Sequence, residues 1–219
     1  MRYKNMGDIM SLICLEGASA VGKTSTGNEF AKRTNTYIIP EVNILFERPK
    51  EESKTWYLER QVERWMIAQE KLQKYDTVIL DGDIFQPISY NWCFDFKIFN
   101  QSLDFIYQFY FEEIKEGRIG FPNKYFYLYT NEENIRYRKE NDSTRKRGNF
   151  ENHIKIIEPH KRYYKALNEL APNYVQLIDA KSIKGNINTI AGNLPTSSLI
   201  KDSEKLLDKV NNWLSNNKA

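Results

Sequence analysis

The sequence predicts an α/β fold in which helices cover both faces of a parallel sheet. Five short apolar runs of strand length alternate with longer segments whose apolar residues recur at helical spacing. Continuous apolar runs are typical of strands buried on both faces, which occur mainly in parallel sheets. The chain has 219 residues, of which 41% are hydrophobic and 28% are charged, so it can bury a sizeable core. We therefore expect a single domain over residues 1–219.

The first half of the chain alternates strand, helix, strand, helix, strand. The predicted strands are Ser11 to Glu16, Thr36 to Pro40 and Thr77 to Leu80, and the predicted helices are Lys23 to Thr34 and Lys54 to Tyr75. Pro40 stops the second strand because proline has no N–H to donate to a sheet. In the longer helix, Leu58, Val62 and Trp65 recur near helical spacing, which predicts one buried face.

The second half continues the alternation after an aromatic-rich stretch, residues 84–122. That stretch predicts helices, of which the clearest covers about 101–116. Beyond it we expect strands at Lys124 to Tyr129 and Tyr174 to Ile178, and helices at Glu132 to Lys139, Phe150 to Leu170 and Asp202 to Asn216.

Charge and composition restrict the kind of partner. The net charge is 32 − 29 = +3, and segment 136–147 alone carries +4, with six basic and two acidic residues. A nucleic-acid binder usually spreads its basic charge over a face, so one basic segment favours a polyphosphate ligand instead. The longest early apolar run, Ile9 to Leu15, is too short to span a membrane. We expect no nucleic-acid partner and no membrane partner, and a homodimer stays open.

Cysteine use indicates the compartment. Only Cys14 and Cys93 are present, which suits a reducing environment and is too few for a zinc cluster. The N-terminus has no secretory pattern. We therefore expect a cytoplasmic protein.

A phosphate-binding motif follows the first predicted strand and opens the first helix. Residues 17–24, GASAVGKT, match the P-loop pattern G-x-x-x-x-G-K-[ST]. Its backbone N–H groups and the helix N-terminus bind phosphates, Lys23 reaches the outer phosphates, and the Thr24 hydroxyl ligates Mg²⁺. The alternative is a chance glycine turn. The motif predicts that ATP and Mg²⁺ bind at Gly17, Ala18, Ser19, Ala20, Val21, Gly22, Lys23, Thr24 and Ser25.

An acid at the end of the third predicted strand is the second part of the expected nucleotide site. Asp81 lies where a P-loop fold places an acid near the metal, although Asp-Gly is also a common turn. A GTPase is disfavoured because Phe126 replaces the acid of an N-K-x-D motif and no D-x-x-G follows the strand. A motor ATPase would need a longer chain.

Candidate acceptor-binding residues follow the second and third strands. Glu41 comes directly after the second strand, where a carboxylate can take the proton of an attacking hydroxyl; otherwise it is an ordinary loop acid. Asp81 and Asp83 are further candidates. Tyr57, Gln61 and Arg64 share one face of the next helix, which either binds a flat polar ligand or is a solvated face.

The basic segment predicts a lid over about 138–150. Arg138, Arg145 and Arg147 could close over the transferring phosphoryl group and stabilise its oxygens. The alternative is a solvated run of charge. His153 and His160 lie seven residues apart on the following helix, and we expect them to be structural.

This layout resembles the thymidylate kinase and deoxynucleoside kinase group of P-loop kinases. The resemblance covers roughly residues 10–190 and rests on short motifs: Gly17–Thr24, Glu41, Asp81, Arg136–Arg147 and the sequence Ile-Asp-Ala at 178–180. It implies a five-stranded sheet in the order 2-3-1-4-5, Glu41 as catalytic base, and adenine bound beside the stretch after Ala180.

Two positions depart from that family. The family usually has an arginine after the third-strand acid, where this chain has Gly82, and Pro40 precedes Glu41 rather than following it. The leading hypothesis, which rests on the motifs that do match, is a Mg·ATP-dependent kinase of a nucleoside or nucleotide. The alternatives are a P-loop phosphotransferase that modifies an antibiotic or nucleotide sugar, and a nucleotide-binding regulatory protein.

Overall fold

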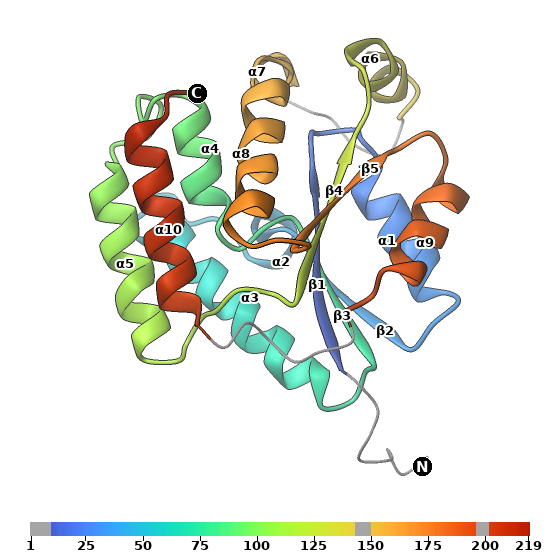
Figure 1. The fold of residues 1–219 in the computed structure, drawn as a ribbon, viewed down its shortest axis with the longest axis horizontal. Coiled ribbons are helices and arrows are strands. Elements are labelled where there is room, and N and C mark those ends of the chain that lie inside the picture. The colour runs from blue at the N-terminus through green and yellow to red at the C-terminus, as the bar shows by residue number, and fades with distance from the viewer. Residues whose placement is uncertain (1–9, 143–149, 196–201) are drawn as a thin grey trace.

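The computed structural model describes residues 10–142, 150–195 and 202–219. They contain a five-stranded sheet in the order β2-β3-β1-β4-β5, and every neighbouring pair is parallel (Figure 1). The strands are β1 (Ser11–Gly17), β2 (Thr36–Ile39), β3 (Thr77–Asp81), β4 (Lys124–Tyr129) and β5 (Val175–Asp179). The predicted α/β fold and strand order are confirmed.

Helices cover the two faces of the sheet unequally. Among the described helices, α1 (Lys23–Ala31) and α9 (Ile183–Gly192) cover one face, as Figure 1 shows. The other carries the larger core and the helices α3 (Trp56–Leu72), α4 (Gln86–Cys93), α5 (Leu103–Lys115), α8 (Ile157–Leu170) and α10 (Ser203–Asn216). The described helices include none that is long and apolar enough to cross a bilayer.

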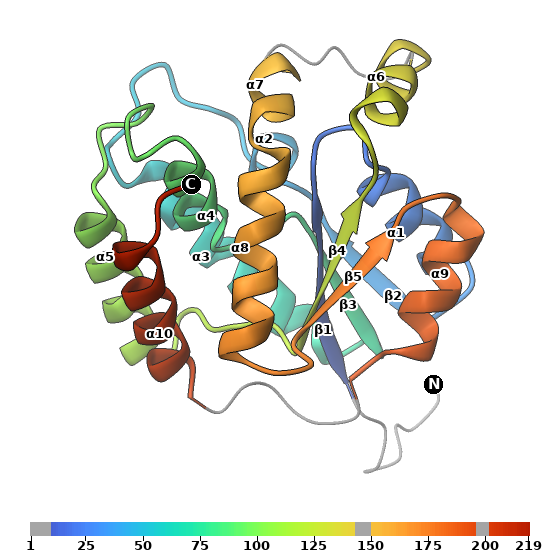
Figure 2. The ribbon, with the colours of Figure 1, turned by 45° about the horizontal axis from the view of Figure 1, so that its top comes forward.

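The C-terminal ends of the strands meet at one edge of the sheet. Leu15 in β1 is level with Asp81 in β3 and with Phe126 in β4. The chain segments that leave β1, β3 and β4 therefore all start from this edge, within a few residues of one another. The helices α6 (Glu132–Glu140) and α7 (Phe150–Lys155) lie above this edge (Figure 2). Side chains from distant parts of the sequence can meet there.

The predicted single helix over Phe150 to Leu170 is wrong, because the structure has two helices, α7 and α8, that join at Ile156. Pro159 explains the break. Proline has no N–H, and its ring clashes with the carbonyl four residues earlier, which here belongs to Lys155. That residue is the last of α7.

Two described helices, α2 (Val42–Leu45) and α9, were not predicted from the sequence, and α4 lies in the stretch 84–122 for which helices were expected without bounds. In α4, six of the eight residues are buried, so it lacks the polar face that produces a helical period. The start of α9 had a readable signal, since Ser182 caps it by accepting a hydrogen bond from the Gly185 N–H at 3.1 Å.

Gly17, the last residue of β1, predicts a strong effect of substitution. Its φ is +142°, and a Cβ there would lie 2.1 Å from the Leu128 carbonyl oxygen. Gly17→Ala should lower the free energy of unfolding by about 1–3 kcal/mol or more, measured by urea denaturation. Gly192→Ala is the control, because a Cβ there meets nothing within 4 Å. Equal stability of the two variants would contradict the close approach of the strands.

Candidate active site

The turn between β1 and α1 lines one side of a deep cleft at the carboxyl edge of the sheet. The cleft has a volume of about 1240 Å³, and all of residues 17–25 line it. Gly22, with a φ of +104°, is the residue before α1, and Ala20 is also left-handed, with a φ of +67°. The helix N-terminus and the turn can therefore present several backbone N–H groups to an anion.

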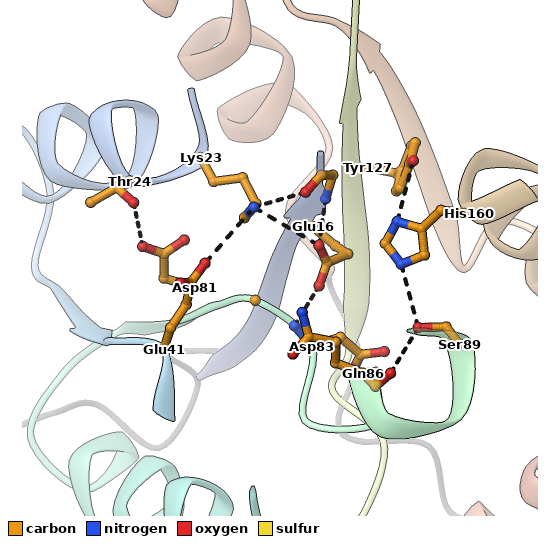
Figure 3. A network of polar contacts seen from close by, with 12 residues as sticks. Glu16, Lys23, Thr24, Glu41, Asp81, Asp83, Gln86, Ser89, Tyr127 and His160 are labelled. Atoms are coloured by element: carbon orange, nitrogen blue, oxygen red, sulfur yellow. Dashed lines mark hydrogen bonds and ion pairs between the residues drawn. The ribbon is translucent and has the colours of Figure 1, made fainter. Parts of the chain in front are cut away.

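Lys23 lies at the centre of a cluster of acids (Figure 3). Its Nζ donates a hydrogen bond to the Gly17 carbonyl at 2.8 Å and lies 4.0 Å from Glu16 Oε1 and 3.9 Å from Glu41 Oε1. Burial lowers the pKa of Lys23, but Glu16 and Glu41 outweigh this and raise it above its ordinary value. Lys23 therefore stays cationic and can bind a phosphate oxygen.

Thr24 and Asp81 together offer oxygen ligands to a metal ion. The Thr24 hydroxyl donates to Asp81 Oδ2 at 2.7 Å, while Asp81 Oδ1 is buried with no hydrogen-bond partner among the described residues. Burial raises the pKa of Asp81, and Lys23 and Thr24 oppose that shift. No group of three or more metal-binding side chains occurs in the described ranges. One hydroxyl and one carboxylate suit Mg²⁺, which takes its other ligands from water and phosphates.

Glu16 is a site residue that the sequence analysis missed. It is 2% exposed at the end of β1, where Oε1 accepts a hydrogen bond from the Gly17 N–H and Oε2 accepts one from the Asp83 N–H, both at 2.7 Å. It therefore joins the start of the P-loop to the chain leaving β3. A readable signal was present: an acid ends an otherwise apolar strand, directly before the first glycine of the motif.

Asp83 is buried below the cleft rather than lining it. Its Oδ1 accepts hydrogen bonds from the Phe85 N–H at 3.0 Å and the Tyr125 hydroxyl at 2.7 Å, and its Oδ2 accepts one from the Tyr164 hydroxyl at 2.9 Å. Burial, followed by the charge of Glu16, raises the pKa of Asp83 to about 6. These contacts occupy Asp83 with the protein itself, so it has a structural role in this arrangement.

Glu41 lines the cleft opposite the P-loop. Its side chain is 37% exposed. The nearby residue Gly82 has no side chain that could cover it. Gly82 has a φ of +86°, and a Cβ there would lie 3.4 Å from Glu41 Cγ and 4.0 Å from Glu16 Oε2. A side chain at position 82 would therefore point at these two acids, and the glycine leaves Glu41 accessible from the cleft.

The face of α3 that was predicted to bind a ligand divides into two parts. Tyr57 lines the cleft, and its hydroxyl donates to Gln86 Oε1 at 2.9 Å. Gln61 and Arg64 do not line it, since they are 0% and 1% exposed. Arg64 donates to Gln61 Oε1 at 2.7 Å and to the carbonyls of Asp81 and Gly82 at 2.9 and 3.0 Å. It supports the backbone at the end of β3.

Only part of the predicted lid is described. Arg145 and Arg147 lie outside the described residues. Arg138, on α6, donates to the carbonyls of Val21 and Ala180, so it connects the P-loop to the chain leaving β5. Arg136 forms an ion pair with Glu132 of the same helix at 2.8 Å and one with Glu151 at 2.7 Å, and the second links α6 to α7.

His160, on α8, lies 5% exposed at the wall of the cleft. Its Nε2 is 3.3 Å from Ser89 Oγ, and its Nδ1 is 3.5 Å from the Tyr127 hydroxyl (Figure 3). Burial lowers the pKa of His160 to about 3, with smaller contributions from Lys23 and His153. It is therefore neutral at physiological pH, in agreement with the structural role expected for it.

The sheet order and the position of the P-loop are those of the P-loop kinase fold, and several solved structures share this fold. A deoxyadenosine kinase from M. mycoides with bound dATP is 19% identical, with a TM-score of 0.53, over 83% of this chain and 97% of that one. A thymidylate kinase from Candida albicans is 18% identical, with a TM-score of 0.55, over 89% of this chain and 96% of that one. A thymidylate kinase from Ehrlichia chaffeensis is 16% identical, with a TM-score of 0.53, over 84% of this chain and 98% of that one.

The chain therefore has the fold of the thymidylate and deoxynucleoside kinases, which confirms the resemblance of layout seen in the sequence. At these identities the likeness concerns the fold alone. No family profile matches the sequence, and no curated protein sequence matches it.

The buried His160 predicts how stability depends on pH. Its pKa is about 3 when folded and about 6.5 when unfolded, so the unfolded chain binds the extra proton and stability falls as pH drops below 6.5. Asp83 opposes this, because its pKa is raised on folding, but the shift of His160 is larger. His160→Gln should reduce this loss of unfolding free energy between pH 6.5 and 4.5. His153→Gln is the control, and an unchanged slope in His160→Gln contradicts the assignment.

Proposed function

We propose that the protein is an ATP- and Mg²⁺-dependent kinase that transfers the γ-phosphoryl group to a hydroxyl of a small acceptor, a nucleoside or nucleotide. One observation carries this proposal: Lys23, Thr24 and the partly exposed acid Glu41 line one cleft, and Asp81 lies buried behind Thr24 at hydrogen-bond distance. A site for phosphate, a site for metal and an acid able to take a proton are the parts that phosphoryl transfer needs.

The P-loop side of the cleft suits the nucleoside triphosphate. Backbone N–H groups of the P-loop would bind the phosphates, and Lys23 would neutralise charge on the outer two. Thr24 and Asp81 would hold Mg²⁺, which supplies positive charge to the β- and γ-phosphate oxygens when bound. Arg138 already lies between the P-loop and Ala180, next to the region that the resemblance assigns to adenine.

The opposite side of the cleft suits an uncharged alcohol. Its polar side chains from α3 and α4 are mostly neutral: Tyr57, Gln86, Tyr90 and Asn91. Arg48 and Lys54 also line the cleft, but Arg48 forms an ion pair with Glu52 and Lys54 lies over the Phe105 ring, 4.1 Å from its centroid. A phosphate acceptor would need cations that are available to it, whereas an alcohol needs a base.

Glu41 is the base in this mechanism. As the acceptor oxygen forms its bond to the γ-phosphorus, the bond from that phosphorus to the β–γ bridging oxygen breaks, and ADP carries away the electron pair. The hydroxyl proton passes to the Glu41 carboxylate. Lys23 Nζ lies 3.9 Å from Glu41 Oε1, so the cation for the outer phosphates and the acid for the acceptor are neighbours.

A second candidate is a phosphotransferase that acts on another small alcohol, such as an antibiotic or a nucleotide sugar. Gly82 favours it, because the nucleoside-kinase group usually has an arginine there and this chain presents only backbone to Glu41. ATP consumption across a panel of nucleosides, nucleotides, antibiotics and nucleotide sugars separates the two candidates.

Lys23→Ala should abolish transfer while the fold persists. It removes the cation from the outer phosphates, and electrostatic stabilisation is the main catalytic device in phosphoryl transfer. The measurement is ADP production, with circular dichroism to verify folding. Lys32→Ala, at the exposed C-cap of α1, is the matched control. Transfer by Lys23→Ala within about tenfold of wild type would contradict the P-loop assignment.

Glu41→Gln should reduce single-turnover transfer to an alcohol by about 10²–10⁴-fold with little change in ATP affinity, since glutamine keeps the size but cannot take a proton. Glu63→Gln, which removes an exposed acid of α3, is the control. A mild loss with a monophosphate acceptor identifies a nucleotide kinase. Wild-type speed on an alcohol removes Glu41 from the mechanism.

A further inference from the structure

Helix α8 directs two buried polar side chains at one neighbouring segment. His160 and Tyr164 are one turn apart on the same face of α8, and they are 5% and 0% exposed. The segment they contact, residues 83–91, leaves β3 and forms most of α4. Gln86, Pro87, Tyr90 and Asn91 of this segment line the cleft. We call residues 83–91 together with Tyr57 the acceptor wall.

The donor and the acceptor can be assigned at each hydrogen bond of His160. The Ser89 hydroxyl donates to the Gln86 carbonyl at 3.3 Å, so Ser89 Oγ is left to accept a hydrogen bond from His160 Nε2–H. His160 Nδ1 then carries no proton and accepts from the Tyr127 hydroxyl. The neutral ring therefore connects β4 to the first turn of α4, as Figure 3 shows.

Tyr164 holds the beginning of the same segment. Its hydroxyl donates to Asp83 Oδ2 at 2.9 Å, and the Asp83 N–H in turn donates to Glu16 at 2.7 Å. Asp83 Oδ1 accepts from the Phe85 N–H, which fixes the turn into α4. The acceptor wall is thus attached to α8 at two points, Asp83 and Ser89, six residues apart.

These two attachments constrain the side chains that face the cleft. Gln86 lies between them, and its Oε1 is engaged by the Tyr57 hydroxyl at 2.9 Å, so its amide donors remain for a ligand. Hydrogen bonds restrict orientation more strongly than apolar contacts do. Loss of either attachment would let Gln86 and Tyr90 shift relative to Glu41, while the P-loop stays in place through Glu16.

We infer that His160 and Tyr164 are positioning residues that fix the acceptor wall and thereby set the affinity for the acceptor. This inference rests on the proposed kinase function. Neither residue takes part in proton transfer, and neither contacts the P-loop. Their loss should therefore weaken acceptor binding and leave ATP binding unchanged.

The test uses conservative variants that keep or remove one hydrogen bond at a time. His160→Gln keeps an amide N–H near the position of Nε2 and can still donate to Ser89, whereas the shorter side chain of His160→Asn cannot reach it. Tyr164→Phe removes only the hydroxyl, so it offers a milder change if a His160 variant fails to fold. Ser89→Ala, alone and combined with His160→Asn, completes a double-mutant cycle.

Two readouts are measured on the full chain. Hydrogen exchange of residues 83–93 reports on the acceptor wall whether or not transfer occurs. Steady-state kinetics with ATP and a panel of ribo- and deoxynucleosides report KM for each substrate. For His160→Asn and Tyr164→Phe we expect exchange in this segment and acceptor KM to rise by about tenfold, the value of one hydrogen bond, with the KM for ATP unchanged. His160→Gln should restore both.

The outcomes separate the inference from the proposed function. Unchanged exchange in residues 83–93 overturns the inference, whatever the activity. Faster exchange with an unchanged acceptor KM, an equal rise of both KM values, or additive effects in the cycle with Ser89→Ala also overturns it, because the contacts are then only structural. Absence of transfer to every acceptor by the wild-type protein, with ATP bound, overturns the proposed kinase function and the acceptor role with it.

Discussion

The carboxylate of Glu16 holds the two halves of the candidate site together. A buried charge is stable only when it is paired and hydrogen-bonded, and Glu16 accepts N–H donors from Gly17 and Asp83, with Lys23 at 4.0 Å. The first donor belongs to the P-loop and the second to the chain leaving β3. Because Asp81 is only two residues before Asp83, the same contact also places the acid that would face Mg²⁺.

Acids outnumber cations around this point. Glu16, Glu41, Asp81 and Asp83 converge at the ends of three strands, and the neighbouring cations are Lys23 and Arg64. Arg64 is buried and donates to backbone carbonyls and to Gln61, so Lys23 alone of the two lines the cleft. An anionic ligand by itself would meet this excess of negative charge, whereas a phosphate that arrives with Mg²⁺ brings compensating charge. This excess of acids supports the proposal that the nucleotide would bind together with Mg²⁺.

Much of the fold could be predicted because parallel strands that are buried on both faces occur in the sequence as short continuous apolar runs. The P-loop was equally readable, since its glycines and Lys23 occur at one spacing beside a strand. The orientation of Arg64 was not, because helical periodicity places a residue on a face and does not tell whether that face meets the cleft or the backbone of Gly82. The role of Glu16 depends on an N–H donor 67 residues away in the chain, and His160 depends on Ser89, 71 residues away. Such long-range polar contacts have no local pattern.

The break at Pro159 separates two helices with different attachments. Below it, α8 is bound to β4, α4 and Asp83 through His160 and Tyr164. Above it, α7 is bound to α6 through the Arg136–Glu151 ion pair, which is exposed and therefore weak. Because proline removes one hydrogen bond at this junction, bending there costs less than bending a continuous helix. The junction at Ile156 thus separates α8, which buried polar contacts hold beside the acceptor wall, from α7, which an exposed ion pair holds to α6. A substitution in α7 should therefore disturb the acceptor wall less than one in α8.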